Sequence, residues 1–206
     1  QLLRVTGGRE RMAVFLEQAE GQRPSEDRLD ALQRSKQRHY GELVAAGEIR
    51  LRPGVLRLMG AAAAAGVRQA IVTTSGRSAV EALLSRQLPQ HRDWLEFWVC
   101  GEDVMAKKPD PQGYGRALER LACSADRVLA VEDSGHGVTA ARGAGLTVLA
   151  TRSASSSQEP DAHFAGAAAL VDGLGDPAMP CQVFRGPACP EGQITLSYLQ
   201  QLFPGG

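Results

Sequence analysis

The sequence lacks an excess of charge of either sign, a long apolar run and a leader-like segment. Lysine plus arginine and aspartate plus glutamate each number 23 among 206 residues, so the formal net charge is zero. Without a basic field the chain is not expected to bind nucleic acid, although a small charged ligand is compatible with it. Its apolar runs are shorter than the roughly 18 to 20 residues of a membrane span, and no signal peptide is recognisable. We therefore expect a cytoplasmic protein without a membrane or nucleic-acid partner.

Cysteine is scarce, and its spacing does not indicate a metal site. The four cysteines form no CxxC or CxxH pair, so the usual zinc and redox motifs are absent (Cys100, Cys123, Cys181 and Cys189). We expect them to be reduced and to have structural roles. The chain also lacks an initial methionine and begins Gln-Leu-Leu within a helix-like pattern. We therefore interpret it as a fragment of a longer protein.

The first 50 residues contain no strand-like run. Between residues 9 and 20, apolar residues recur every three or four positions, which predicts an amphipathic helix. A second helix is predicted after Ser25, which can cap its first turn, and it continues through Leu43. We expect residues 1–50 to form a small helical cap domain.

From residue 51 onward, apolar strands alternate with helices. Helices are predicted over residues 55–65, 78–88, 111–122 and 195–203, with an Ala-rich helix ending at Gly145, and strands over 69–74, 97–100, 127–132, 146–151 and 168–171. Residues 173–193 are rich in proline and glycine and are predicted to be irregular. Strands separated by helices indicate right-handed βαβ crossovers and a parallel sheet covered on both faces. The predicted fold is therefore α/β, with a Rossmann-like core over residues 51–206.

Three polar segments are expected to meet at one edge of this sheet. Glu132 and Asp133 end the central strand, Thr73 follows the strand over 69–74, and Lys108 precedes a helix. Ligands of open α/β sheets gather beyond the carboxyl ends of the strands. A hydroxyl and turn N–H groups can hold phosphate oxygens, an ammonium can neutralise them, and carboxylates can hold Mg²⁺. This set is suited to phosphoryl transfer.

Each of these residues also has an ordinary structural interpretation. Thr73 and Ser75 are typical of caps and turns, and Lys108 is typical of a solvated surface charge. The acids Glu132 and Asp133 are harder to explain in this way, because carboxylates directly after an apolar strand are costly to desolvate without a cation or donors. The combination is therefore more informative than any one member.

The order TTS, then KKPDP, then VEDSGHGVTAARGAG resembles motifs two, three and four of the haloacid dehalogenase-like hydrolases. The likeness is to the CbbY-like branch in particular, which is similar to β-phosphoglucomutase and the sugar-phosphate phosphatases and places a small helical cap before most of the core. LLRVTGGRER and LRPGV resemble the cap of this branch and its return hinge. The resemblance extends over nearly the whole sequence.

This resemblance implies roles for single positions. Thr73 matches the hydroxyl that binds the transferring phosphoryl group, and Lys108 matches the lysine that stabilises its charge. Asp133 with Glu132 matches the acidic motif that serves Mg²⁺. Ser75, Gly76 and Arg77 match the turn that contacts a distal substrate group. Arg9 matches an arginine that grips the non-reacting phosphate, and Lys36 matches a cap lysine that faces the site. For Arg9 and Lys36 the alternative is an exposed helix charge.

The nucleophile motif of the family has no counterpart in this sequence. Family members use an aspartate nucleophile and a second aspartate two residues later as acid/base, at the end of the first core strand and before the cap. No DxD motif occurs here, and Glu102-Asp103 and Asp126 do not follow a strand with the necessary turn. The resemblance implies that about 40 to 50 residues, including the central first strand, are missing. We expect the chain alone to be inactive and, with two open strand edges, poorly soluble.

The resemblance implies that the parent protein hydrolyses a sugar phosphate with Mg²⁺ through an aspartyl-phosphate, with xylulose-1,5-bisphosphate as the candidate substrate. A cationic cap residue such as Arg9 would bind the second phosphate of this substrate. Two alternatives stay open: a phosphosugar mutase of the β-phosphoglucomutase type, and a non-catalytic remnant that binds Mg²⁺ and phosphate. We expect the complete protein to be a monomer.

Overall fold

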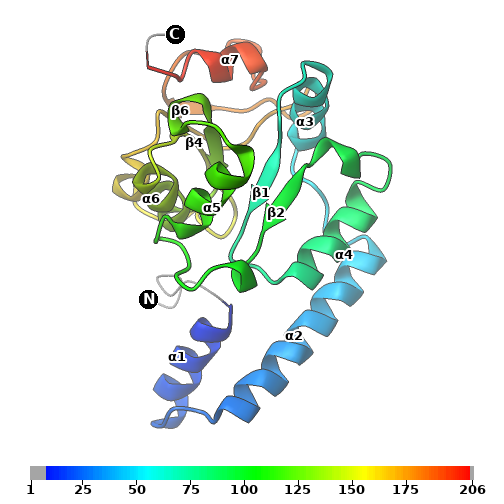
Figure 1. Cartoon of the computed structure of the whole chain (residues 1–206), viewed down its shortest axis with the longest axis vertical. Coiled ribbons are helices and arrows are strands. Elements are labelled where there is room, and N and C mark those ends of the chain that lie inside the picture. The colour runs from blue at the N-terminus through cyan, green and yellow to red at the C-terminus, as the bar shows by residue number, and fades with distance from the viewer. Residues whose placement is uncertain (1–7, 205–206) are drawn as a thin grey trace.

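The computed structural model describes residues 8–204 and contains two sheets flanked by helices (Figure 1). The first sheet pairs two parallel strands, β1 (Ala70–Val72) and β2 (Phe97–Val99). The second has the order β3-β4-β5-β6, with β3, β4 and β5 parallel and β6 antiparallel to β5. Its strands are β3 (Leu129–Glu132), β4 (Thr147–Thr151), β5 (Ala169–Val171) and β6 (Val183–Arg185).

The five strands predicted from apolar runs are all present, each slightly shorter than predicted. Strand β6 lies within the segment predicted to be irregular, so that prediction was wrong there. β6 is an edge strand paired only with β5, and its register is interrupted between Leu170 and Val171. A short edge strand of this kind forms because it pairs with another strand, so its own residues give little indication of strand structure.

The predicted helices are also present. They are α1 (Gly8–Glu20), α2 (Glu26–Ala46), α3 (Val55–Ala64), α4 (Arg77–Gln87), α5 (Gln112–Leu121), α6 (Gly135–Gly143) and α7 (Leu196–Gln200). The Ser25 hydroxyl caps α2 by accepting a hydrogen bond from the backbone N–H of Arg28, as its sequence position predicted. At the other end of α2, Gly47 has a φ of 76°, a left-handed conformation that glycine adopts without steric cost.

The core centres on β4, all five residues of which are buried. Helices α5 and α6 supply Tyr114, Val138 and Ala141 to the cluster on one side. On the other side, Leu58 of α3 and Tyr198 of α7 pack with Leu149 of β4. Helices therefore cover both faces of the second sheet, as predicted for a doubly covered α/β sheet.

The two sheets do not form one continuous ladder within residues 8–204, which differs from the single parallel sheet that was predicted. An apolar cavity of about 490 Å³ is lined by Ile71 and Val72 of β1 and by Ala130 and Val131 of β3, among other residues. Val131 is 43% exposed although it lies in the middle of a strand. The facing edges of β1 and β3 have no strand partner in the described part of the chain.

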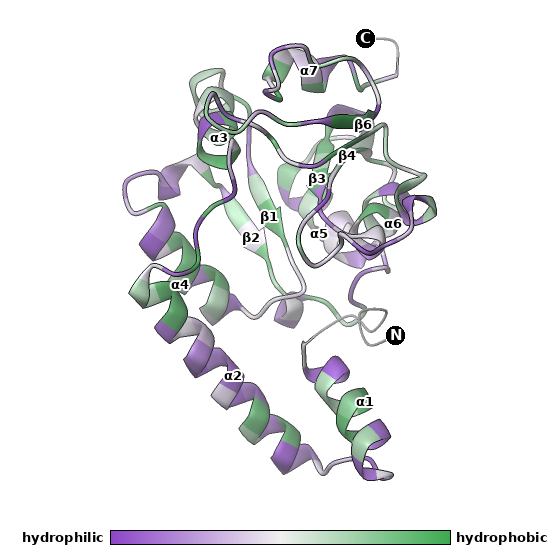
Figure 2. Cartoon of the chain, turned by 180° about the vertical axis from the view of Figure 1, so that it is seen from behind, coloured by the Kyte–Doolittle hydropathy of each residue, from purple (hydrophilic) through white to green (hydrophobic). Residues whose placement is uncertain are grey.

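Helices α1 and α2 form an antiparallel hairpin that extends away from the strands, and the end of α2 packs against α4 (Figure 1). Both helices carry hydrophilic and hydrophobic residues in alternation (Figure 2). Few of their side chains are buried, and Phe15, Leu32 and Leu43 are exposed. No helix among the described residues is both long and apolar enough to cross a membrane.

Candidate functional site

The Lys108 side chain joins the carboxyl ends of β1 and β3. Its ammonium group donates one hydrogen bond to the carbonyl oxygen of Val72, at 2.9 Å, and a second to the Oε1 atom of Glu132. The side chains of Lys108 and Glu132 are only 15% and 6% exposed. Because Thr73 follows Val72 and Asp133 follows Glu132, this contact brings the predicted hydroxyl, ammonium and carboxylates to one rim.

Tyr114 is a site residue that the sequence analysis missed. It lies on α5, is buried, and its hydroxyl donates a hydrogen bond to the same Glu132 oxygen that Lys108 contacts. Burial, and then the negative charge of Glu132, raise the pKa of Tyr114 far above its usual value, so the hydroxyl remains a donor. A tyrosine among the apolar positions of an amphipathic helix is a signal that its hydroxyl requires a polar partner.

The other carboxylate oxygen of Glu132 packs against Gly137 in the first turn of α6. A Cβ atom at Gly137 would overlap this oxygen, so only glycine leaves room for the carboxylate. The Ser134 hydroxyl caps α6 by accepting a hydrogen bond from Gly137 N–H, and Glu159 accepts one from Gly135 N–H at 3.0 Å. Glu159 lies in the Ser-rich loop and was also missed, because that loop has no pattern pointing to α6.

Asp133 and Glu132 have different surroundings although they are adjacent. The Oε1 atom of Glu132 accepts hydrogen bonds from Lys108 and Tyr114, whereas Asp133 is exposed and forms no hydrogen bond or ion pair with the described residues. A free carboxylate oxygen at a strand end is a suitable Mg²⁺ ligand. No group of three metal-ligating side chains converges within residues 8–204. Asp133 is therefore suited to be one ligand of Mg²⁺. The described residues do not supply the other ligands.

The turn after β1 is held by its own hydrogen bonds. The Oγ1 atom of Thr73 accepts a hydrogen bond from Ser75 N–H at 3.0 Å, and Ser75 is exposed. The start of α4 is stabilised by Glu102, whose carboxylate accepts a hydrogen bond from Arg77 N–H at 3.1 Å. A side chain at Gly76 would crowd Glu102. Two side-chain acceptors, Thr73 and Glu102, therefore hold the backbone of this turn.

The guanidinium of Arg77 is paired with Asp103, at 2.6 and 2.8 Å. This hydrogen bond raises the pKa of Arg77. The backbone N–H of Cys100 and then the Arg77 guanidinium lower the pKa of Asp103 against the opposing effect of desolvation. Arg77 and Asp103 thus have structural partners in this arrangement.

Arg9 and Lys36 have neighbours within the hairpin of α1 and α2. Arg9 donates to Asp30 at 2.6 Å and to Glu26 at 2.8 Å, and these hydrogen bonds raise its pKa. Lys36 is exposed, and its ammonium group occupies the space where a side chain at Gly8 would lie. Arg9 and Lys36 therefore lie on α1 and α2, and within residues 8–204 neither forms a hydrogen bond or ion pair with Thr73, Lys108 or Asp133.

A family model described as haloacid dehalogenase-like hydrolase matches residues 3–145, more than half of the chain. The chain belongs to the haloacid dehalogenase-like hydrolases. Among curated relatives of this hydrolase, CbbY of Cupriavidus necator is 40% identical over 188 residues, which cover 87% of this chain and 72% of that protein. CbbY of Rhodobacter capsulatus is 42% identical over 153 residues, covering 74% of this chain and 67% of the relative.

Solved structures agree with this membership. The crystal structure of Rhodobacter sphaeroides CbbY in complex with phosphate has a TM-score of 0.75 and 37% identity, covering 84% of this chain and 75% of that one. A point mutant of the same CbbY in complex with xylulose-1,5-bisphosphate has a TM-score of 0.76 and 36% identity, covering 85% and 77%. The hydrolase is thus close to CbbY in sequence and in fold, with a mostly parallel sheet and N-terminal helices.

Proposed function

We propose that this chain is part of a Mg²⁺-dependent sugar-phosphate phosphatase of the CbbY type, which acts through an aspartyl-phosphate on a sugar bisphosphate. Xylulose-1,5-bisphosphate is the candidate substrate. The observation that carries the proposal is the similarity of 36% identity and TM-score 0.76 to a CbbY that binds this compound. The Lys108 bridge between β1 and β3 supports it, because Lys108 contacts Val72 and Glu132, the residues directly before Thr73 and Asp133.

The roles at the rim follow from the contacts of each side chain. Lys108 stabilises the charge of the transferring phosphoryl group, and Thr73 binds one of its oxygens. Asp133 holds Mg²⁺, which when bound neutralises phosphoryl oxygens. Glu132, which the motif assigns to the metal together with Asp133, orients Lys108 through its hydrogen bond. We therefore propose Asp133 as the direct ligand and Glu132 as a positioning residue.

The remaining ligands and the nucleophile are proposed to come from a further strand that pairs with both β1 and β3. The open facing edges of these strands and the apolar cavity of about 490 Å³ between them support this proposal. Such a strand would place its carboxyl end beside Lys108 and Asp133. In this proposal the strand belongs to a segment preceding Gln1, and the chain alone lacks turnover.

We also propose that residues 1–50 form a cap over a core of residues 51–206. An ion pair at 2.6 Å between Glu10 of α1 and Lys107 connects the hairpin to the loop that carries Lys108. Arg9 and Lys36 would then bind the distal phosphate when the cap closes, and Ser75, Gly76 and Arg77 would form the substrate-facing turn. Arg9 would have to exchange Glu26 and Asp30 for the phosphate to do so.

The proposal is tested by phosphate release from a panel of sugar phosphates, including xylulose-1,5-bisphosphate, with Mg²⁺ present. The native full-length protein and residues 1–206 are compared side by side. We expect release only from the full-length protein, and a fall in kcat of about 100-fold or more for Lys108→Ala. Arg127→Ala serves as the control and should retain full activity, because Arg127 is exposed and precedes the start of β3, at the opposite end of the strand from Glu132.

The products distinguish the alternatives. If the phosphate stays on the sugar and the sugar is isomerised, the enzyme is a mutase and not a phosphatase. If the full-length protein with Mg²⁺ releases no phosphate from any member of the panel and isomerises none, the enzymatic proposal fails and a binding remnant takes its place. Release by residues 1–206 alone would refute the proposed need for a further strand.

A further inference from the structure

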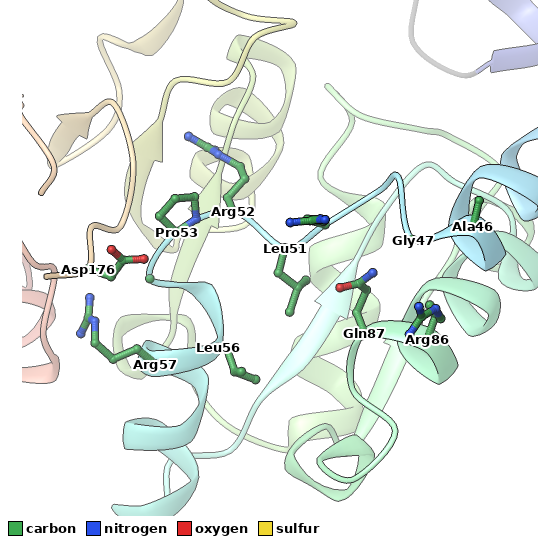
Figure 3. A pocket seen from close by; sticks show the side chains of 12 residues that line it. Ala46, Gly47, Leu51, Arg52, Pro53, Leu56, Arg57, Arg86, Gln87 and Asp176 are labelled. Carbon is green, nitrogen blue, oxygen red and sulfur yellow. The ribbon is translucent and has the colours of Figure 1, made fainter. Parts of the chain in front are cut away.

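A second concave surface lies along the linker between α2 and α3, residues 47–54. It forms a pocket of about 830 Å³, bordered by the end of α2, the linker, the start of α3 and the end of α4. Figure 3 shows Arg52, Arg57 and Asp176 at one end of the pocket and Arg86 and Gln87 at the other. Neither Thr73, Lys108 nor Asp133 lines it, so the pocket is separate from the rim described above.

The pocket carries a marked excess of positive charge. Four arginines and one carboxylate line it. None of these arginines forms an ion pair with a carboxylate of residues 8–204 (Arg50, Arg52, Arg57 and Arg86). The single acid, Asp176, uses its Oδ1 atom to accept hydrogen bonds from the backbone N–H groups of Ala178 and Met179. Asp176 thus forms no ion pair with these arginines, and the pocket keeps a net positive charge.

Two of the arginines are fixed in place by backbone carbonyl groups. Arg52 donates to the carbonyl oxygens of Arg152 and Asp172, the second at 2.7 Å. Arg57 donates to the carbonyl oxygens of Leu174, Gly175 and Ile194 at 2.8 to 3.3 Å. A guanidinium has five N–H groups, so both keep unused donors while their orientation is held. These two side chains are preorganised cations at one end of the pocket.

The other two arginines are available for a ligand. Arg50 and Arg86 are exposed and make no hydrogen bond or ion pair with any described residue. The Arg86 guanidinium lies near Gly47, at the carboxyl end of α2, where a cation is favoured by the helix dipole. That effect accounts for Arg86 but not for Arg50, which lies on the linker. Both can turn toward an anion without breaking an existing contact.

We propose that this linker pocket binds a small organic polyanion with at least two phosphate groups. The arginines at its two ends would each take one anionic group, since guanidinium pairs with phosphate in bidentate fashion. Leu51, Pro53 and Leu56 line the pocket between them and suit the carbon skeleton of such a molecule. A volume of about 830 Å³ is within the usual size of small-molecule sites. The site is independent of the proposed phosphatase activity.

The test uses inorganic pyrophosphate as the probe, titrated calorimetrically into the native full-length protein with EDTA present. We expect saturable binding, with an affinity at least about tenfold higher than that for inorganic phosphate. The double variant Arg50→Gln/Arg86→Gln should weaken pyrophosphate binding at least about tenfold. Lys108→Ala should leave it within about twofold, which separates this site from the catalytic rim.

A charge-matched control is provided by Arg34→Gln/Arg127→Gln, because both arginines are exposed and lie outside the pocket. This control should bind pyrophosphate like the unmodified protein. Equal weakening in control and test variants would show unspecific attraction and overturn the proposal, as would absent binding or binding unaffected by Arg50→Gln/Arg86→Gln. The single variants Arg50→Gln and Arg86→Gln provide the same comparison if the double variant unfolds.

Discussion

Glu10 and Lys107 lie 97 residues apart in the sequence and form an ion pair at 2.6 Å. The next residue, Lys108, pairs with Glu132 at the end of β3. Two adjacent lysines thus connect one loop to two separate parts of the molecule, α1 and the second sheet. The first pair is partly exposed and the second is buried, so the same dipeptide contains a weak and a strong electrostatic contact.

Replacing Lys108 by Met should destabilise the protein far more than replacing Lys107 by Met. Loss of Lys108 leaves the buried Glu132 carboxylate without a charge partner and with the neutral Tyr114 hydroxyl as its remaining donor, and we expect a loss of about 3 kcal/mol in the free energy of unfolding. Loss of Lys107 should cost under about 1 kcal/mol. Urea denaturation of both variants measures the difference, and equal losses would contradict the assignment of a buried pair.

Gly137→Ala should also destabilise the protein, because the added methyl group would overlap the Glu132 carboxylate. We expect a loss of about 1 to 3 kcal/mol. Gly41→Ala is the matched control, since Gly41 lies within α2 and has no atom within 4 Å of its Cβ position. That substitution should stabilise the protein by up to about 1 kcal/mol. Thermal unfolding of both variants measures the contrast, and a neutral Gly137→Ala would refute the close approach.

Asp103 should make stability depend on acidic pH. Its folded-state pKa is lowered by the Cys100 N–H group and by Arg77, so its contribution is present above the ordinary aspartate pKa and is lost as the pH falls through the lower folded value. Asp103→Asn should therefore be less stable than the unmodified protein near pH 6, and the difference should shrink below about pH 4. Urea midpoints at several pH values measure this; a difference independent of pH would contradict it.

Cys181 should react slowly with alkylating reagents in the folded protein. Burial, and then the neighbouring Cys189 thiol, raise the pKa of Cys181 to about 11, so little thiolate exists near pH 8. The rate of iodoacetamide labelling should keep rising with pH beyond 9 in the native protein. In urea it should level off near the ordinary cysteine pKa of about 8.5. Mass spectrometry of the Cys181 peptide measures both profiles, and identical profiles would refute the shift.

Much of the fold was predictable because its signals are local. The apolar run of residues 146–151 predicts a strand buried on both faces, and Ser25 and Gly47 begin and end α2 through their own side-chain and backbone preferences. The candidate site residues Thr73, Lys108 and Asp133 were predicted by residue type and by position, Thr73 and Asp133 at the ends of predicted strands and Lys108 before a predicted helix. Strand β6 and the contribution of Tyr114 were missed, since both depend on partners far away in the sequence.

The sequence by itself determined the α/β class, the order of the elements and the identity of the polar residues near the strand ends. Only the tertiary structure decided that Lys108 spans β1 and β3, that Glu132 has hydrogen-bond donors while Asp133 has none among residues 8–204, and that four arginines line one pocket. The physical reason is distance along the chain. Helix caps and apolar periodicity act within a few residues, whereas desolvation, charge pairing and cavity shape depend on which distant segments the folded chain brings together.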